Sequence, residues 1–258
     1  MPGRSPAYAF GDDRVAAERL ALLHGVFGPA SATFVRTWAP GAVAVALDLG
    51  CGPGHTTRML ARACPGARVI GVDESASFVA DAASDVEVVR HDVTALPFPT
   101  PAPDLVYARF LLAHLAAPEA CVVGWTGLLR DGGRVLLDEV ESIDVRPPAL
   151  ASYLSTIAAV MHDEGHELFV GPALDAMAPP AGSERVFSEV VEVRPTTGEA
   201  ARMFLPNLGV WRTRPAAKAR ADEETFDALA DGLLGLADSD ARGEIVWHMR
   251  QVVIERVA

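Results

Sequence analysis

Val45-Ala-Leu-Asp-Leu-Gly-Cys-Gly-Pro-Gly-His-Thr-Thr57 is the stretch that decides the fold of this chain. It begins as an apolar run typical of a buried strand, and a helix over 55–63 is predicted directly after the turn. Gly50, Gly52 and Gly54 let the backbone take conformations or approach distances that a Cβ would forbid. In α/β proteins, such a unit places a ligand against the first turn of the helix. The turn is therefore predicted to bind a ligand.

Two features separate this turn from the dinucleotide-binding fingerprint G-x-G-x-x-G. His55 stands where the last glycine belongs, and Gly54 falls one residue early. The expected downstream acidic residue is present, because a second apolar strand over 67–72 is followed by Asp73. A carboxylate there can accept hydrogen bonds from both hydroxyls of an adenosine ribose. These residues alone leave open a nicotinamide cofactor, or a turn that only packs tightly.

With these motifs the chain resembles the class I S-adenosylmethionine-dependent methyltransferases of the small-molecule type, whose first motif has the form D-x-G-x-G-x-G. Asp48 and the three glycines match that motif, and Asp73 matches the acidic strand end. The resemblance continues through the adenine-binding segment at 91–98, the fourth strand at 103–115 and the fifth strand at 128–137. Four motifs in this order and spacing make a specific signal for the family.

The resemblance implies a site for S-adenosylmethionine along the carboxyl ends of the strands. The glycine turn would meet the methionyl and ribose parts, Asp73 would take the ribose hydroxyls, and Asp92 would accept from the adenine amino group. Asp48 is open to two interpretations, direct contact with the cofactor or orientation of the turn. The residues expected to bind the cofactor are Asp48, Gly50, Cys51, Gly52, Gly54, Asp73, Glu74, Asp92, Val93 and Arg109.

Apolar strands alternating with helices predict an α/β fold with a doubly wound, mostly parallel sheet covered on both faces. The resemblance implies seven strands, the last of them antiparallel and inserted between the fifth and the sixth. The alternating run 185–194 and the apolar end 245–254 would supply that pair. We expect one domain over 1–258, whose core comprises 40–140, 184–194 and 244–256.

The remaining segments read as helices and are expected to form a lid over the cofactor edge of the sheet; they are 1–38, 145–182 and 199–237. Gly28-Pro29 is predicted to break the first of them into two helices. Large apolar side chains in the lid predict a mostly apolar acceptor pocket. The candidate residues for binding the acceptor are Tyr8, Phe10, Arg109, Tyr153, Met161, Phe204 and Trp211.

No catalytic residue follows from the sequence, although three histidines are candidates for a general base: His114, His162 and His166. Arg109 has two open roles, because its carbonyl suits the cofactor amine whereas its guanidinium suits a substrate carboxylate. The fourth strand ends in Tyr107-Ala-Arg-Phe110, without the Pro-Pro-Tyr or Pro-Cys of DNA methyltransferases. It also lacks the metal-binding carboxylate of catechol-type enzymes, so a small-molecule acceptor is expected.

The composition of the chain restricts the classes of partner that it is expected to bind. A net charge of −12 would repel a polyphosphate, so no nucleic-acid partner is expected. Three cysteines without C-x-x-C spacing suggest neither a disulfide framework nor a metal site. No signal pattern and no apolar run of about 18 residues is found, so a cytoplasmic protein without a membrane partner is expected. The oligomeric state is left open.

The function expected from the sequence is methyl transfer from S-adenosylmethionine to a small organic acceptor, in specialised metabolism. Two alternatives remain at this point. One is a non-catalytic S-adenosylmethionine-binding protein on the same fold. The other is a protein or RNA methyltransferase, which would display a basic or extended groove.

Overall fold

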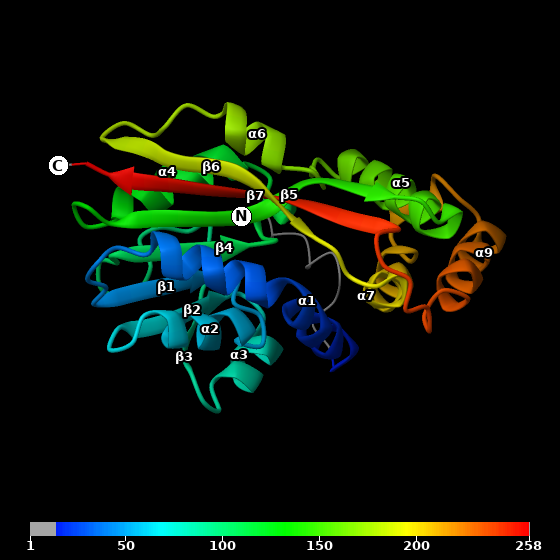
Figure 1. The fold of residues 1–258 in the computed structure, drawn as a ribbon, viewed down its shortest axis with the longest axis horizontal. Helices are drawn as coiled ribbons and strands as arrows, with labels where there is room; N and C mark the ends of the chain where they lie inside the picture. The colour runs from blue at the N-terminus through cyan, green and yellow to red at the C-terminus, as the bar shows by residue number, and fades with distance from the viewer. Residues whose placement is uncertain (1–13, 258) are drawn as a thin grey trace.

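A computed structural model describes residues 14–257. Seven strands form one sheet in the order β3-β2-β1-β4-β5-β7-β6 (Figure 1). The strands are β1 (Val45–Leu49), β2 (Arg68–Asp73), β3 (Glu87–Arg90), β4 (Leu105–Arg109), β5 (Arg134–Val145), β6 (Ser183–Val193) and β7 (Ile245–Arg256). The first five pair in parallel, and β7 pairs antiparallel with both β5 and β6. The predicted fold class is confirmed.

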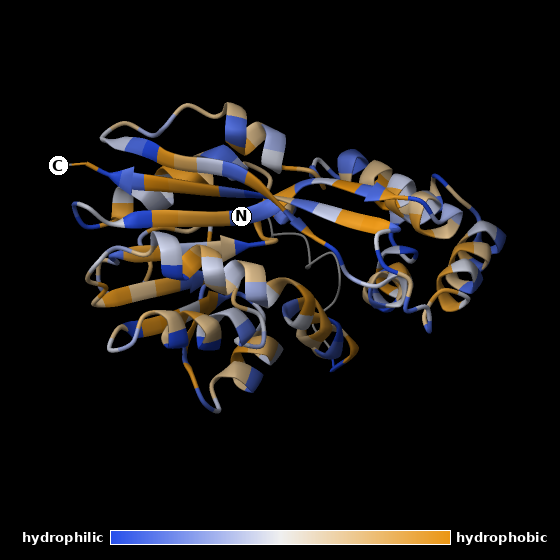
Figure 2. Cartoon of the chain, in the orientation of Figure 1, coloured by the Kyte–Doolittle hydropathy of each residue, from blue (hydrophilic) through white to orange (hydrophobic). Residues whose placement is uncertain are grey.

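Helices cover both faces of this sheet, whose strands carry many hydrophobic residues (Figure 2), so the central strands β1 and β4 are buried except at Arg109, the last residue of β4. The helices are α1 (Arg14–Trp38), α2 (His55–Ala63), α3 (Ala76–Ala82), α4 (Pro118–Leu128), α5 (Pro148–Asp163), α6 (Gly171–Ala176), α7 (Thr197–Trp211), α8 (Pro215–Lys218) and α9 (Glu223–Leu234), with a 3-10 turn η1 (Leu112–His114). On one face Tyr107 and Leu136 pack with Leu60 of α2 and Phe34 of α1. On the other, the core includes Trp125 of α4.

Helix α1 corrects the sequence prediction, because it runs unbroken from Arg14 to Trp38 with Pro29 inside it. An interior proline removes one backbone hydrogen bond and costs a helix about 3 kcal/mol. Burial of Phe27, Phe34 and Val35, together with packing against α2 and α7, offsets that cost. Tertiary packing has therefore overridden a strong local signal.

Beyond the carboxyl ends of the parallel strands, α5, α7 and α9 gather around the far halves of β5 and β7 (Figure 1). Strand β5 extends to Val145, five residues past the core boundary that the sequence suggested. Tyr153 of α5 stacks on Phe204 of α7 with ring centroids 4.4 Å apart, and Trp211 meets Phe226 of α9 edge to face. These long strands therefore carry a helical layer in front of the sheet edge.

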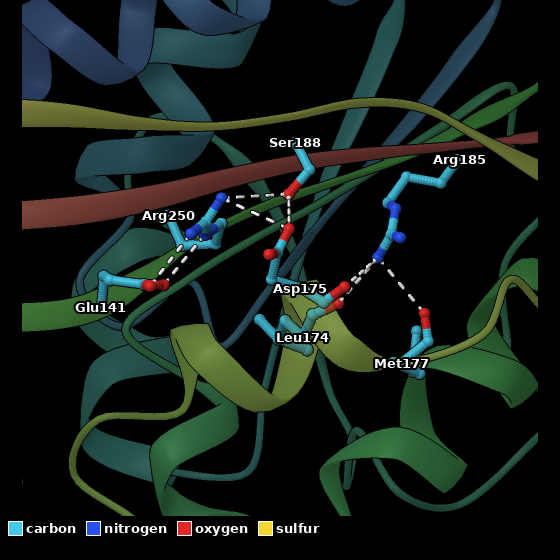
Figure 3. A network of polar contacts seen from close by, with 7 residues as sticks. All are labelled: Glu141, Leu174, Asp175, Met177, Arg185, Ser188 and Arg250. Atoms are coloured by element: carbon cyan, nitrogen blue, oxygen red, sulfur yellow. Dashed lines mark hydrogen bonds and ion pairs between the residues drawn. The ribbon is translucent and has the colours of Figure 1, made fainter.

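Helix α6 is held to the sheet by a polar network on β5, β6 and β7 (Figure 3). Arg250 of β7 donates through Nε and Nη2 to the two carboxylate oxygens of Glu141, both at 2.9 Å. Its Nη1 also reaches Asp175 of α6, whose Oδ1 accepts from Ser188 Oγ at 2.6 Å. Arg185 donates to three carbonyls at the end of α6. The network therefore links three strands and one helix.

We predict that Arg250→Gln lowers the free energy of unfolding by about 2 kcal/mol, because the mostly buried Glu141 loses its bidentate partner. Arg194→Gln is the matched control, since its ion pair with Glu192 is about half exposed and should contribute almost nothing. Urea denaturation of both variants measures the difference. Equal stabilities would contradict this account of α6.

Candidate functional site

The glycine turn between β1 and α2 is fixed to the end of β2. Gly50, Gly52 and Gly54 have φ values of 66°, 51° and 82°, in the left-handed region that other residues rarely adopt. The backbone N–H groups of Gly50 and Cys51 both donate to the Val72 carbonyl, at 2.8 and 3.2 Å. Gly52 N donates to Asp73 Oδ2 at 2.9 Å. The carboxylate at the end of β2 therefore helps to shape the turn.

Asp48 lies beneath this turn, 1% exposed, and accepts hydrogen bonds from the hydroxyls of Thr56 and Thr57, both at 2.7 Å. Burial raises the pKa of Asp48 to about 6, although the two hydroxyls oppose the shift. Asp48 is not among the residues that line the pocket described below. Of the two interpretations left open for Asp48, this geometry favours orientation of the glycine turn, because the carboxylate accepts from the first turn of α2.

A pocket of about 1300 Å³ opens along the carboxyl ends of the strands. Most residues expected to bind the cofactor line it, namely Gly50, Cys51, Gly52, Asp73, Glu74, Asp92, Val93 and Arg109. Gly54 does not, which corrects that expectation. A Cβ at Gly54 would stand 3.2 Å from Ala82 Cβ and 3.1 Å from Val86 Cγ2, so this glycine allows close packing against α3 and the segment that follows it.

The carboxylates at one end of the pocket match the donors of an adenosine. Asp73 accepts a backbone hydrogen bond on each oxygen, from Ser75 N and Gly52 N, and its carboxylate lines the pocket, where a ribose hydroxyl can donate to it. The Oδ1 atom of Asp92 accepts hydrogen bonds from the backbone N–H and the hydroxyl of Thr94. Its Oδ2 atom accepts neither of these two bonds. Trp125 Nε1 donates to the Val93 carbonyl at 2.8 Å and fixes this segment. These residues therefore fit the adenosine part of S-adenosylmethionine.

The end of β4 borders the middle of the pocket. Phe110 takes φ 53°, an unusual conformation for a bulky residue that occurs most often at functional sites. Its ring packs edge to face on Phe27 of α1, with centroids 4.9 Å apart. The neighbouring Arg109 donates through Nη1 to Ser31 Oγ at 3.0 Å, and Ser31 donates to Asp138 at 2.6 Å. The Arg109 side chain is thus oriented by α1 while the residue still lines the pocket.

Glu139 is a pocket residue that the sequence reasoning missed. It is 0% exposed, and its Oε1 accepts from the backbone N–H groups of Leu111 and Leu112 at 2.8 and 3.0 Å. Its Oε2 has no hydrogen-bond partner within residues 14–257. Burial raises the pKa of Glu139 to about 7. The signal was two adjacent carboxylates, Asp138 and Glu139, inside an otherwise apolar strand.

The far end of the pocket mixes aromatic and polar groups. Phe27, Phe110, Tyr153, Phe204 and Trp247 provide rings, and Arg19, His114, His166, Asn207 and Arg214 provide polar groups. Of the residues expected to bind the acceptor, Arg109, Tyr153 and Phe204 line the pocket. Met161 and Trp211 do not, which corrects the expectation, because both are buried inside the helical layer. Tyr8 and Phe10 lie outside the described residues.

The three candidate histidines differ in position. His162 is exposed at the end of α5 and is not among the residues that line the pocket. His114 lines the pocket, but burial and the charges of Arg19, His166 and Arg214 lower its pKa to about 3, which makes it a weak base. His166 lines the pocket, and its Nδ1 is buried without a hydrogen-bond partner in the described part of the chain.

Residues 14–257 also bear on two other expectations, those about a metal ion and a membrane partner. No group of three or more His, Cys, Asp or Glu side chains is placed to hold a metal ion. No helix in this part of the chain is both long and apolar enough to cross a membrane.

Comparison with known proteins agrees with this geometry. The family model described as "Methyltransferase domain" matches residues 47–137. Trans-aconitate 2-methyltransferase of Paracidovorax citrulli is 41% identical over 91 residues, covering 34% of this chain and 35% of that protein. The enzyme of the same name from Delftia acidovorans is 28% identical over 150 residues, or 49% and 54% of the two chains. This chain thus spans about a third to a half of the length of these curated relatives.

A solved structure shares the whole fold. Haemonchus contortus phosphoethanolamine N-methyltransferase 2, in complex with S-adenosyl-L-methionine, aligns at 17% identity with a TM-score of 0.56, over 95% of this chain and 59% of that one. Sheet order, glycine turn and pocket together define a Rossmann-like methyltransferase fold. Residues 47–137 thus match a methyltransferase domain, and the curated relatives and this solved structure are named as methyltransferases.

We predict that Asp73→Ala weakens S-adenosylmethionine binding by at least about 30-fold, since each lost hydrogen bond to a charged group is worth roughly 1.5–3 kcal/mol. The melting temperature should fall by less, because the backbone N–H groups of Gly52 and Ser75 lose their acceptor at the rim of the pocket, where water can replace it. Asp81→Ala is the control, since Asp81 is exposed on α3 and does not line the pocket. An affinity within about twofold of wild type, measured by calorimetry, would contradict the assignment.

Proposed function

We propose that this protein transfers the methyl group of S-adenosylmethionine to a small organic acceptor bound in the same pocket. One observation carries the proposal. The pocket of about 1300 Å³ joins the glycine turn to the aromatic far end without interruption. Pockets for one ligand usually measure about 300–1,000 Å³, so this one has room for a cofactor and an acceptor together.

Methyl transfer requires the protein mainly to position the two reactants and to exclude water. When bound, S-adenosylmethionine supplies a sulfonium-activated methyl group, which a nucleophile displaces in line. Asp73, Asp92 and the glycine turn are proposed to hold the cofactor. The aromatic residues Phe27, Tyr153, Phe204 and Trp247 are proposed to hold the acceptor and exclude water.

The acceptor is proposed to be an organic molecule of the size found in specialised metabolism. The breadth of the aromatic lining supports this, because large rings suit a mostly apolar ligand. The curated relatives are named for trans-aconitate, but the sequences match only over part of each chain. The net charge of −12 argues against an RNA acceptor.

Two measurements on the intact protein test the proposal. Calorimetry should detect binding of S-adenosylmethionine at one site. Incubation with methyl-labelled S-adenosylmethionine and a panel of small acceptors should yield a labelled product that is extractable from the protein. Cofactor binding without transfer to any acceptor would favour a non-catalytic binding protein, and no binding at millimolar cofactor would contradict both.

We predict that Phe204→Ala raises the acceptor KM about tenfold while the cofactor affinity stays the same, because the ring stacks on Tyr153 at the far end of the pocket. Trp211→Phe is the matched control within α7. It should lower the free energy of unfolding by about 2 kcal/mol, since Trp211 is fully buried and donates to the Tyr153 hydroxyl, yet leave the acceptor KM unchanged. An acceptor KM that is unchanged in Phe204→Ala but raised in Trp211→Phe would mean that the acceptor binds elsewhere.

A further inference from the structure

The Glu139 carboxylate is held rigidly at the edge of the pocket. Glu139 lies near the middle of β5, next to the end of β4, and Arg109 pairs with its neighbour Asp138 in the sheet register. The two backbone N–H groups at the start of η1 both donate to Oε1, so this oxygen is fixed by the main chain. The other oxygen, Oε2, is buried beside the pocket and accepts no hydrogen bond within residues 14–257.

Two buried acceptor atoms border the same pocket from different elements. Glu139 Oε2 on β5 and Asn207 Oδ1 on α7 both lack a hydrogen-bond partner in the part of the chain that is described. Their residues are 0% and 6% exposed. Leaving a buried polar atom unpaired destabilises the protein, and a charged group does so more than a neutral one. A ligand that presents hydrogen-bond donors would remove that destabilisation, whereas one that presents only acceptors would not.

We propose that Glu139 is the general base of the methyl transfer, and that the acceptor is a hydroxyl or amine whose proton passes to Oε2. This assignment rests on the proposed function and deepens it by naming the acceptor class. The acceptor oxygen or nitrogen bonds to the methyl carbon while the sulfur–methyl bond breaks. The bonding pair stays on sulfur, which gives S-adenosylhomocysteine, and the proton of the acceptor ends on Glu139.

The groups around Glu139 suit this role. Burial raises its pKa to about 7, opposed by the two N–H groups of η1 and by Arg109, and helped by the charge of Asp138. A base titrating near neutral pH is efficient, because it is ionised in part and still binds the proton well. The other titratable groups that line the pocket near its far end are Arg19, His114, Tyr153, His166 and Arg214, and burial raises the pKa of Tyr153 to about 12. Of these, His114 has a pKa lowered to about 3 and cannot compete as a base.

Glu139→Gln tests the assignment, because the amide keeps an oxygen for both N–H groups and removes only the basic oxygen. Glu141→Gln is the matched control on the same strand, outside the pocket and paired with Arg250. The acceptor probes are 2-naphthol, phenethyl alcohol and phenethylamine, with trans-aconitate as a carboxylate that has no hydroxyl or amine. Measurements are cofactor affinity by calorimetry, melting temperature, and kcat from pH 5 to pH 9 with labelled cofactor.

The expected result is transfer to at least one hydroxyl or amine probe. Wild-type kcat should rise with pH and level off above about 7, since Glu139 must be ionised to take the proton. Glu139→Gln should lower kcat at least about 100-fold and remove this pH dependence, with cofactor affinity unchanged. Glu141→Gln should lower the melting temperature and leave kcat unchanged.

Three results with the variants and the acceptor probes would overturn the assignment, and so would one result with the pH profile. The three are a kcat for Glu139→Gln within about threefold of wild type, transfer to trans-aconitate alone, and no transfer to any probe while the cofactor binds. The wild-type pH profile needs no variant, so a profile that is flat between pH 5 and pH 9 also contradicts it. Absence of cofactor binding by the wild-type protein would instead overturn the proposed function, and this assignment with it.

Discussion

The hydrogen bonds that tie the glycine turn to the end of β2 are the constraint on which the site depends. A turn with three left-handed residues exposes backbone N–H groups that need acceptors. The Val72 carbonyl takes two of them and the Asp73 carboxylate a third. Asp48 fixes the other side by accepting from Thr56 and Thr57 at the start of α2. The turn and the carboxylate proposed to bind the ribose are thus one unit, and neither can move alone.

The remainder of the pocket depends on the length of β5 and β7. Each has 12 residues, more than twice the length of β1 or β4, so their far halves project beyond the sheet edge. This projection supports α5, α7 and α9 opposite the glycine turn, and the network around Arg250 links the same two strands to α6 (Figures 1 and 3). Strand β5 also carries Glu139 at the boundary of the two halves. Strand β5 therefore both supports the helical layer and contributes a residue to the pocket.

Much of this arrangement could be predicted from the sequence, because the strands and the glycine turn carry strong local signals. The sheet order and the antiparallel last strand follow from the family resemblance and are confirmed. The break expected at Pro29 is wrong, since burial of the α1 face outweighs the cost of an interior proline. A sequence window cannot weigh a contact between segments that are distant in the chain.

The acceptor side was harder to predict for a related reason. Helical spacing identifies apolar faces but not which of them borders a pocket, so Met161 and Trp211 were expected there although they are buried among the helices. Glu139 was missed because a carboxylate within an apolar strand shows its role only when its neighbours are known. Histidine was the obvious residue type for a base, yet His162 lies at the surface. The sequence therefore identifies the residues able to take part in chemistry, but it does not show which other residues surround them.

A crystal structure of the intact protein with S-adenosylhomocysteine tests the central claim most directly. The account predicts that the ribose hydroxyls lie within hydrogen-bond distance of Asp73, that the adenine amino group faces Asp92, and that the sulfur faces the part of the pocket between Arg109 and Glu139. A ligand bound in another orientation or outside this pocket, with the Asp73 carboxylate untouched, would contradict it.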